Sequence, residues 1–194
     1  MKVGLGGRWI GLHAAAFVAP EFLGLGPVRP IYAPFWIYIA RSALPLALGV
    51  AVAQAWGGGP VRGVRGWMAT LCGMLLGFAA AWAYTTSLNI TWDEDIDRRL
   101  AAFLNVGLGL LGPLSTGLIL GATQAVVLKE RRLLWIGVTA LAWTLSSALV
   151  QFPAWLWARP WGNIPAPVLL GVQGLLFAML ELPWLRRWAP VSAR

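Results

Sequence analysis

Residues 100–128 read LAAFLNVGLGLLGPLSTGLILGATQAVVL, a stretch of 29 residues without a single Asp, Glu, Lys, Arg or His. Three more stretches of 21 to 27 residues share this property, namely 66–92, 133–158 and 160–180. A transmembrane helix needs ~20 apolar residues, and a charge at its centre costs at least ~2.5 kcal/mol. The four stretches therefore predict four bilayer crossings and an integral membrane protein.

Two further apolar segments, 9–28 and 35–56, are interrupted by polar residues or proline. The first contains His13, Pro20 and Glu21, and the second contains Arg41 and Pro45. Irregular segments of this kind are tolerated where they are buried against other helices. With them, the sequence predicts an all-α transmembrane bundle that forms one domain over residues 1–194. Its six spans, in three hairpins, are about 9–28, 35–56, 66–86, 102–128, 133–157 and 165–185.

Composition restricts where a function can be located. Charged residues make up 11% of the chain, against about 25% in soluble domains. The longest polar connection, 85–101, is too short to bury a core of its own, so any function must lie in or at the membrane. The net charge is +8, but the basic residues flank apolar runs and no nucleic-acid motif accompanies them. We therefore exclude nucleic acid as a partner.

The basic residues also predict the orientation of the spans. If six spans start and end in the cytoplasm, ten basic residues lie inside and five lie outside or near the outer end, as the positive-inside rule requires. The ten inner residues are Lys2, Arg8, Arg62, Arg65, Lys129, Arg131, Arg132, Arg186, Arg187 and Arg194. Both termini are thus expected in the cytoplasm, and the expected location is a bacterial inner membrane.

Tryptophan is abundant, with thirteen residues. Ten of them, Trp9 and Trp135 included, fall at or near predicted span ends, where aromatic belts form at the headgroups. Trp143 alone lies clearly in the middle of a span. Packing in the core is favoured for Trp143 over contact with a ligand.

An internal repeat emerges when Gln54 is aligned with Gln124. The first copy reads LALGVAVAQAW, a basic turn GGGPVRGVRG, and WMATLCGMLLGFA; the second reads GLILGATQAVVL, KERRL and LWIGVTALAWTLSSA. Gln173 occupies the comparable place in the last span. The repeat predicts that helical hairpins are the building units.

The pattern G-x-x-Q-A-x-x-L, basic turn, Trp and apolar helix resembles a repeat in small, uncharacterised polytopic membrane proteins of bacteria. It covers 46–149, matches best at 121–128, and implies no activity. Length, span number and the segment HAAAFVA with Ala15-x-x-x-Ala19 are also similar to the substrate-binding subunits of energy-coupling-factor vitamin transporters. This second resemblance implies a closed solute pocket near the outer face, with Trp92, Asn89 or Trp143 as ligand candidates.

Small and polar residues within the spans predict how the helices associate. Gly73 and Gly77, and likewise Gly117 and Gly121, lie four residues apart and allow close helix packing, within the chain or with a partner helix. Four glutamines within or near the spans must find hydrogen-bond partners, because an unsatisfied amide in hydrocarbon costs several kcal/mol. These are Gln54, Gln124, Gln151 and Gln173, and interhelical hydrogen bonds are the favoured explanation.

Ionisable residues at membrane depth are functional candidates by default. They are His13, Glu21, Arg41 and Glu181. An ion pair between Glu21 and Arg41 would neutralise both charges. His13 could serve as a single axial ligand to a haem or chlorin, although a hydrogen-bonded structural histidine is favoured, and no other cofactor and no metal are expected.

The remaining polar cluster is the acidic loop 93–97. Its alternating aspartates resemble the start of a calcium loop, but Arg98 replaces the required glycine and Leu104 the bidentate glutamate, so we reject an EF-hand. The sequence contains no GxSxG, HExxH or Walker motif.

Three functional hypotheses follow. The first is a non-enzymatic membrane subunit, surrounded by lipid, that packs against other membrane-protein subunits, for example in a respiratory or photosynthetic assembly. The second is a solute-binding component of a transporter with a vitamin-type substrate. The third, a membrane enzyme or pigment-binding protein, rests only on Glu181 and His13, and we expect no enzymatic activity.

Overall fold

The computed structural model describes residues 5–25, 34–87, 98–156 and 166–188, which form helices and turns and contain no β-strand. Segments α2, η2 and α3 follow one another without a break and make one helix over Phe35–Trp56 with a π-helical middle. The elements are α1 (Leu5–Phe22), α2 (Phe35–Tyr38), η2 (Ile39–Ala43), α3 (Leu44–Trp56), α4 (Gly63–Ser87), α5 (Arg98–Val127), α6 (Arg132–Leu156) and α7 (Ala166–Trp188).

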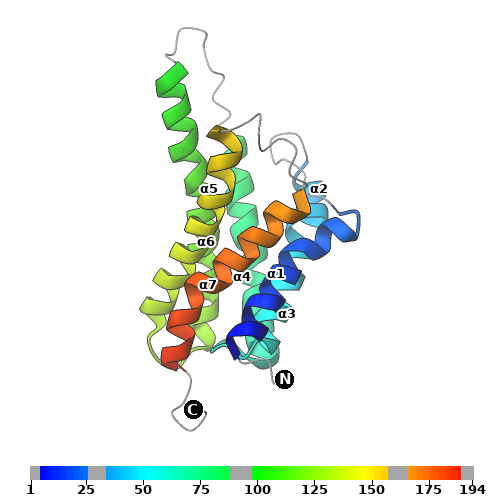
Figure 1. The fold of residues 1–194 in the computed structure, drawn as a ribbon, viewed down its shortest axis with the longest axis vertical. Coiled ribbons are helices and arrows are strands. Elements are labelled where there is room, and N and C mark those ends of the chain that lie inside the picture. Colours follow the sequence, from blue (N-terminus) through cyan, green and yellow to red (C-terminus); the bar gives the residue numbers. More distant parts are fainter. Residues whose placement is uncertain (1–4, 26–33, 88–97, 157–165, 189–194) are drawn as a thin grey trace.

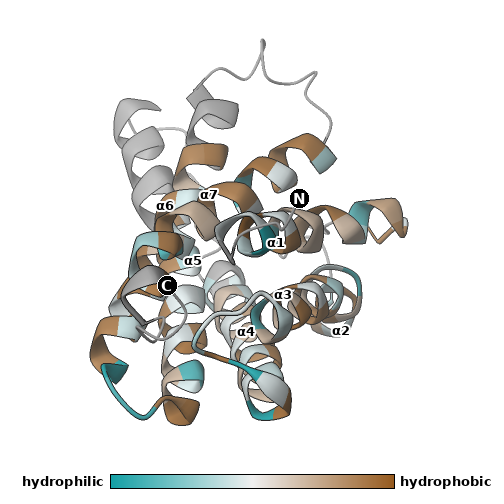
Figure 2. Ribbon diagram, turned by 60° about the horizontal axis from the view of Figure 1, so that its bottom comes forward, coloured by the Kyte–Doolittle hydropathy of each residue, from teal (hydrophilic) through white to brown (hydrophobic). Residues whose placement is uncertain are grey.

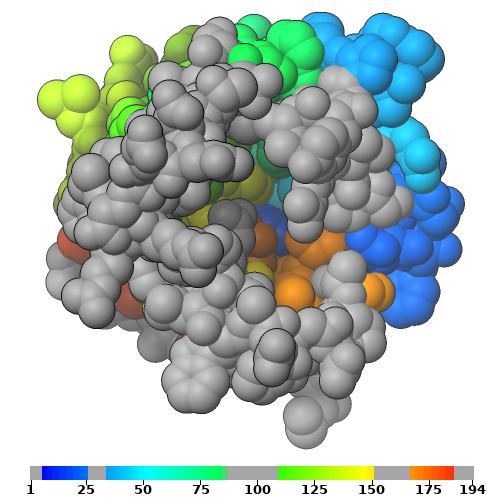
Figure 3. Space-filling view, turned by 90° about the horizontal axis from the view of Figure 1, so that it is seen from above, coloured from blue at the N-terminus to red at the C-terminus, as the bar shows by residue number. Residues whose placement is uncertain are grey.

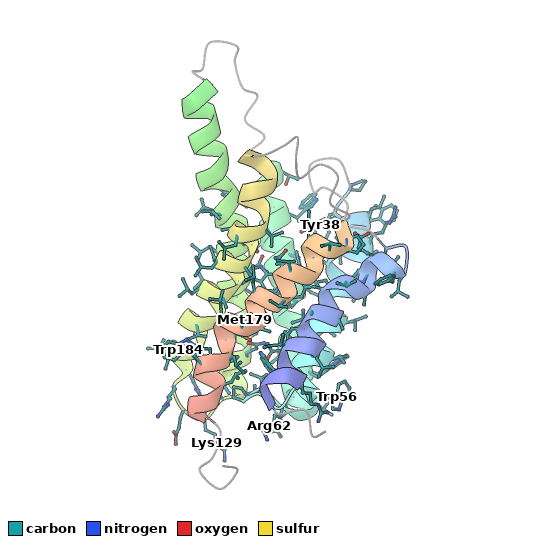
Figure 4. All side chains as sticks on the ribbon, in the orientation of Figure 1. Tyr38, Trp56, Arg62, Lys129, Met179 and Trp184 are labelled. Carbon is teal, nitrogen blue, oxygen red and sulfur yellow. The ribbon has the colours of Figure 1, made fainter. Side chains whose placement is uncertain are left out.

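The helices close into a ring. Helices α3 to α7 each pack against the next in the chain, and α1 packs against both α3 and α7. Figure 1 shows that α1 begins and α7 ends at the same end of the bundle as the α3–α4 and α5–α6 turns. We call this end the basic end, because Arg62 and Lys129 lie there in Figure 4 whereas Tyr38 lies toward the other end. Seen from that other end, α7 lies beside α1 (Figure 3).

Five helical segments of the described chain are long and apolar enough to cross a membrane: Phe35–Trp56, Gly63–Tyr84, Gly109–Val127, Arg132–Val150 and Pro167–Leu185. Hydrophilic residues gather in the α3–α4 and α5–α6 turns, whereas hydrophobic residues extend along the helices (Figure 2). The chain therefore has the fold of a polytopic, helical membrane protein.

The first expected span, 9–28, differs from the prediction. Helix α1 covers Leu5–Phe22 instead of 9–28, because Gly24 adopts φ +67° and the amides of Leu23, Gly24 and Leu25 bond back to the last turn. It is not among the five apolar segments, since its arginine, histidine and glutamate reduce its hydropathy. The bounds of the other five long helices differ from the predicted spans by at most four residues.

Two apolar clusters fill the inside of the ring. The central cluster takes residues from all six long helices: Ala16, Phe17, Ala47, Val50, Ala53, Met74, Leu120, Ala142, Trp143 and Phe177. A second cluster, nearer the basic end, contains Trp9, Val61, Leu128, Trp135, Ala178 and Leu185. Because every long helix contributes to the central cluster, close packing of these side chains holds the ring together.

Candidate functional site

Between the two apolar clusters lies a layer of fully buried polar side chains, which we call the polar layer. Each long helix contributes one residue with 0% exposed surface: His13, Gln54, Thr70, Gln124, Thr139 and Glu181. Spacing along the helices explains the position of the layer. In α7, for example, Phe177 of the central cluster and Leu185 of the basic-end cluster lie four residues before and after Glu181, on the same helix face.

One half of the layer is well hydrogen-bonded. The side-chain amide of Gln124 on α5 donates to Thr70 Oγ1 on α4 at 3.0 Å, and its Oε1 accepts from Trp135 Nε1 on α6 at 2.8 Å. These distances are those of good hydrogen bonds. The amide therefore connects three helices with both of its polar atoms in use.

The other half is centred on Glu181. Its Oε2 accepts from Gln54 Nε2 on α3 at 3.5 Å, and its Oε1 accepts from Thr139 Oγ1 on α6 at 3.4 Å. Both distances exceed the usual range for hydrogen bonds, and Gln54 Oε1 is buried without any partner. No ion pair of Glu181 occurs in the described part of the chain.

His13 lies in the same layer on α1. Its Nδ1 is 2.9 Å from the carbonyl oxygen of Trp9, which can only accept, so Nδ1 carries a proton. Its Nε2 is buried without a partner, and its ring packs against the rings of Trp9 and Phe177. Close contacts of α3 with α1, from Gly49 to Ala16 and from Gly57 to Trp9, place Gln54 at the level of His13.

The four predicted packing glycines lie at helix contacts inside the chain. A Cβ at Gly77 would come within 2.9 Å of Thr116 Cα, and Gly73 also faces α5, so this pair joins α4 to α5. A Cβ at Gly117 or Gly121 would lie 2.8 Å from the backbone of α6. Both glycine faces are therefore used within the bundle.

The expected ion pair between Glu21 and Arg41 is not formed. Glu21 is near the end of α1, where its Oε1 is buried without a partner, while Arg41 lies in η2 with an exposed side chain. The amide of Gln173 on α7 donates to Ser147 Oγ on α6 at 2.9 Å. Gln124 and Gln173 thus form good hydrogen bonds to side chains on other helices, whereas Gln54 makes one long contact with Glu181.

The tryptophan prediction fails at two positions. Trp9 and Trp135 are fully buried in the basic-end cluster, so neither reaches the headgroup region. Each lies on the side of its helix that faces the inside of the ring. Trp143 packs against Phe17, Phe78 and Phe177 in the core. Trp92, Asn89 and the acidic loop 93–97 lie outside the described residues.

Thr70 and Thr139 were not among the predicted site residues. A threonine is common in membrane helices, so its type alone gave no signal. A signal did exist in the spacing, because Trp135, Thr139 and Trp143 follow one another at intervals of four residues.

No family model, no curated protein and no solved structure matches this chain.

Proposed function

We propose that this chain is a non-enzymatic membrane subunit that packs against a transmembrane helix of another membrane protein through α1. The exposed face of α1 supports this proposal, since it carries small residues at intervals of four: Gly7, Gly11, Ala15 and Ala19. A Cβ at Gly11 would meet nothing within 4 Å. Small residues at this spacing let two helix backbones approach closely in lipid, where packing drives association.

The faces that other helices expose differ from that of α1. Helix α6 exposes Leu133, Leu141, Leu145 and Leu149, and α3, α5 and α7 also expose Leu, Val or Met side chains. Leucine is as apolar as lipid tails and needs no protein partner. The contrast favours α1 as the face that a second helix covers.

The proposed topology has six spans in three hairpins, both termini in the cytoplasm and a bacterial inner membrane as location. Helix α1 has 18 residues and is therefore about 27 Å long, close to the ~30 Å of a hydrocarbon core. The basic side chains at one end of the bundle support the cytoplasmic assignment of that end.

Native mass analysis after mild detergent extraction tests the subunit proposal. We expect the wild-type protein to be recovered with a partner chain, and the variant Gly11→Leu to lose it because the bulky side chain blocks close approach. Gly137→Leu is the matched control, since Gly137 on α6 is exposed and equally open. Recovery of the wild type as a partner-free monomer would refute the proposal.

A second candidate function is a solute-binding component of a transporter. The observation that favours it is that two buried atoms of the polar layer, His13 Nε2 and Gln54 Oε1, have no hydrogen-bond partner, which a polar ligand would supply. Thermal-shift screening of vitamins tests it, because a ligand at a hundredfold excess over its dissociation constant stabilises a protein by ~2.7 kcal/mol. A flat response across the screen would argue against this role.

A further inference from the structure

The two halves of the polar layer differ in how well they are satisfied. Both polar atoms of the Gln124 amide have partners at 2.8 and 3.0 Å. Gln54 holds Glu181 only at 3.5 Å, and its Oε1 has no partner. Buried polar groups normally are hydrogen-bonded, so the Glu181 half keeps an unused acceptor atom whereas the Gln124 half is fully hydrogen-bonded.

Charge restricts what a ligand of Glu181 can be. A fully buried carboxyl group is either neutral or paired with a positive charge, and helix segments 44–56, 133–150 and 167–180 that surround Glu181 contain no charged side chain. His13, from α1, does not supply the charge, because its Nδ1 proton is held by the Trp9 carbonyl and its Nε2 faces no acceptor. A ligand that binds the ionised form of Glu181 therefore carries one positive charge.

The spacing of the oxygen atoms fits a small metal cation. For metal-to-oxygen distances of about 2.4 Å, ligands at right angles lie about 3.4 Å apart. Thr139 Oγ1 lies 3.4 Å from Glu181 Oε1, and the Gln54 amide nitrogen lies 3.5 Å from Glu181 Oε2. Rotating that amide by half a turn places its oxygen where the nitrogen stands, since the two atoms are assigned only from their hydrogen bonds.

We propose that Glu181, Gln54 and Thr139 bind one monovalent metal cation of the size of Na⁺ within the bundle. Three oxygen ligands suit a hard cation, and one carboxylate balances a single charge. With the amide turned in this way, Gln54 Oε1 would coordinate the cation, and the cation would connect α3, α6 and α7. This cation site lies apart from the exposed face of α1 and does not depend on the proposed subunit role.

Thermal unfolding of the purified protein in detergent tests the site. NaCl replaces N-methylglucamine chloride at constant ionic strength, so only the identity of the cation changes. We expect the melting temperature to rise with Na⁺ concentration until it saturates, because a ligand that binds only the folded state stabilises it. KCl should give a smaller rise at the same concentration, because K⁺ is larger than the oxygen spacing allows.

Substitutions assign the effect to these residues. Glu181→Gln keeps the shape but removes the charge, and it should abolish the Na⁺-dependent rise. Gln54→Ala and Thr139→Val should reduce the rise, and they provide the test if Glu181→Gln does not fold. Gln173→Ala removes another buried amide, bonded to Ser147, and should keep the full rise.

Two results would overturn the proposal. One is a wild-type melting temperature that does not depend on Na⁺, which would mean that Glu181 is a neutral carboxylic acid satisfied by its neighbours. The other is a Na⁺-dependent rise that persists in both Gln54→Ala and Thr139→Val, which would place the cation elsewhere.

Discussion

The contact between α5 and α6 gives a quantitative prediction. A Cβ added at Gly117 would lie 2.8 Å from Ala140 Cα and 2.9 Å from Trp143 Cβ. Carbon atoms pack at about 3.5 to 4.0 Å, so Gly117→Ala must push the helices apart by roughly 0.7 Å. The obstacle is mainly backbone, which no rotamer change can move aside.

The cost can be isolated by comparison with a second glycine. Gly137 is on α6, is exposed, and has nothing within 4 Å of its hypothetical Cβ. Both Gly→Ala changes gain about 0.5–1 kcal/mol of helix propensity, which cancels in the comparison. Overpacking at Gly117 costs about 1–3 kcal/mol, so Gly117→Ala should be less stable than Gly137→Ala by that amount.

Unfolding in mixed micelles measures this difference. Sodium dodecyl sulfate is titrated into dodecylmaltoside micelles, and loss of tryptophan burial is followed by fluorescence. Gly137→Ala should unfold at a higher fraction of the denaturing detergent than the wild type, and Gly117→Ala at a lower fraction than Gly137→Ala. If Gly117→Ala were as stable as Gly137→Ala, the close approach of α5 and α6 described above would be wrong.

Two more predictions concern the polar layer and the membrane. Gln124→Leu removes two interhelical hydrogen bonds and should lower the free energy of unfolding by about 1–3 kcal/mol. Gln173→Leu removes one such bond and should lower it by less. Equal losses of stability in the same unfolding assay would contradict this prediction. Cys72, the chain's one cysteine, is exposed on α4, so a nitroxide attached to it in liposomes should collide more often with oxygen than with a water-soluble nickel complex. Preferential collision with nickel would place this face of α4 in water.

Much of the fold could be predicted because charge exclusion is a strong local signal. An uncharged run such as 100–128 has one stable state in lipid, a helix, so α5 follows directly from composition. The first span was predicted less well. The end of this helix depends on Gly24, whose positive φ stops the helix. A glycine adopts positive and negative φ with similar ease, so the sequence alone does not indicate which glycine ends the helix.

The candidate site was harder to predict because it depends on pairs of helices. Glu181 and Gln54 are 127 positions apart in the chain, and nothing in either local sequence specifies the other. The same limit explains why Glu21 and Arg41 were paired incorrectly, since two opposite charges near neighbouring helix ends do not determine which faces meet. Trp9 was misassigned because a tryptophan near a helix end suits a headgroup belt and an interior cluster equally well.

The polar layer also explains what fixes the orientation of each helix about its own axis. Successive residues of an α-helix are turned by about 100°, so a shift of one position would move Gln124 or Glu181 toward lipid. Exposure of an amide or a carboxyl group to hydrocarbon costs several kcal/mol, whereas the leucines that cover the outer faces are indifferent to their neighbours in lipid. Apolar packing therefore holds the ring together, and the polar layer selects one rotational setting of each helix. A site that requires ligands from α3, α6 and α7 gains from this selection, because the same burial penalty that orients the helices brings Glu181, Gln54 and Thr139 together.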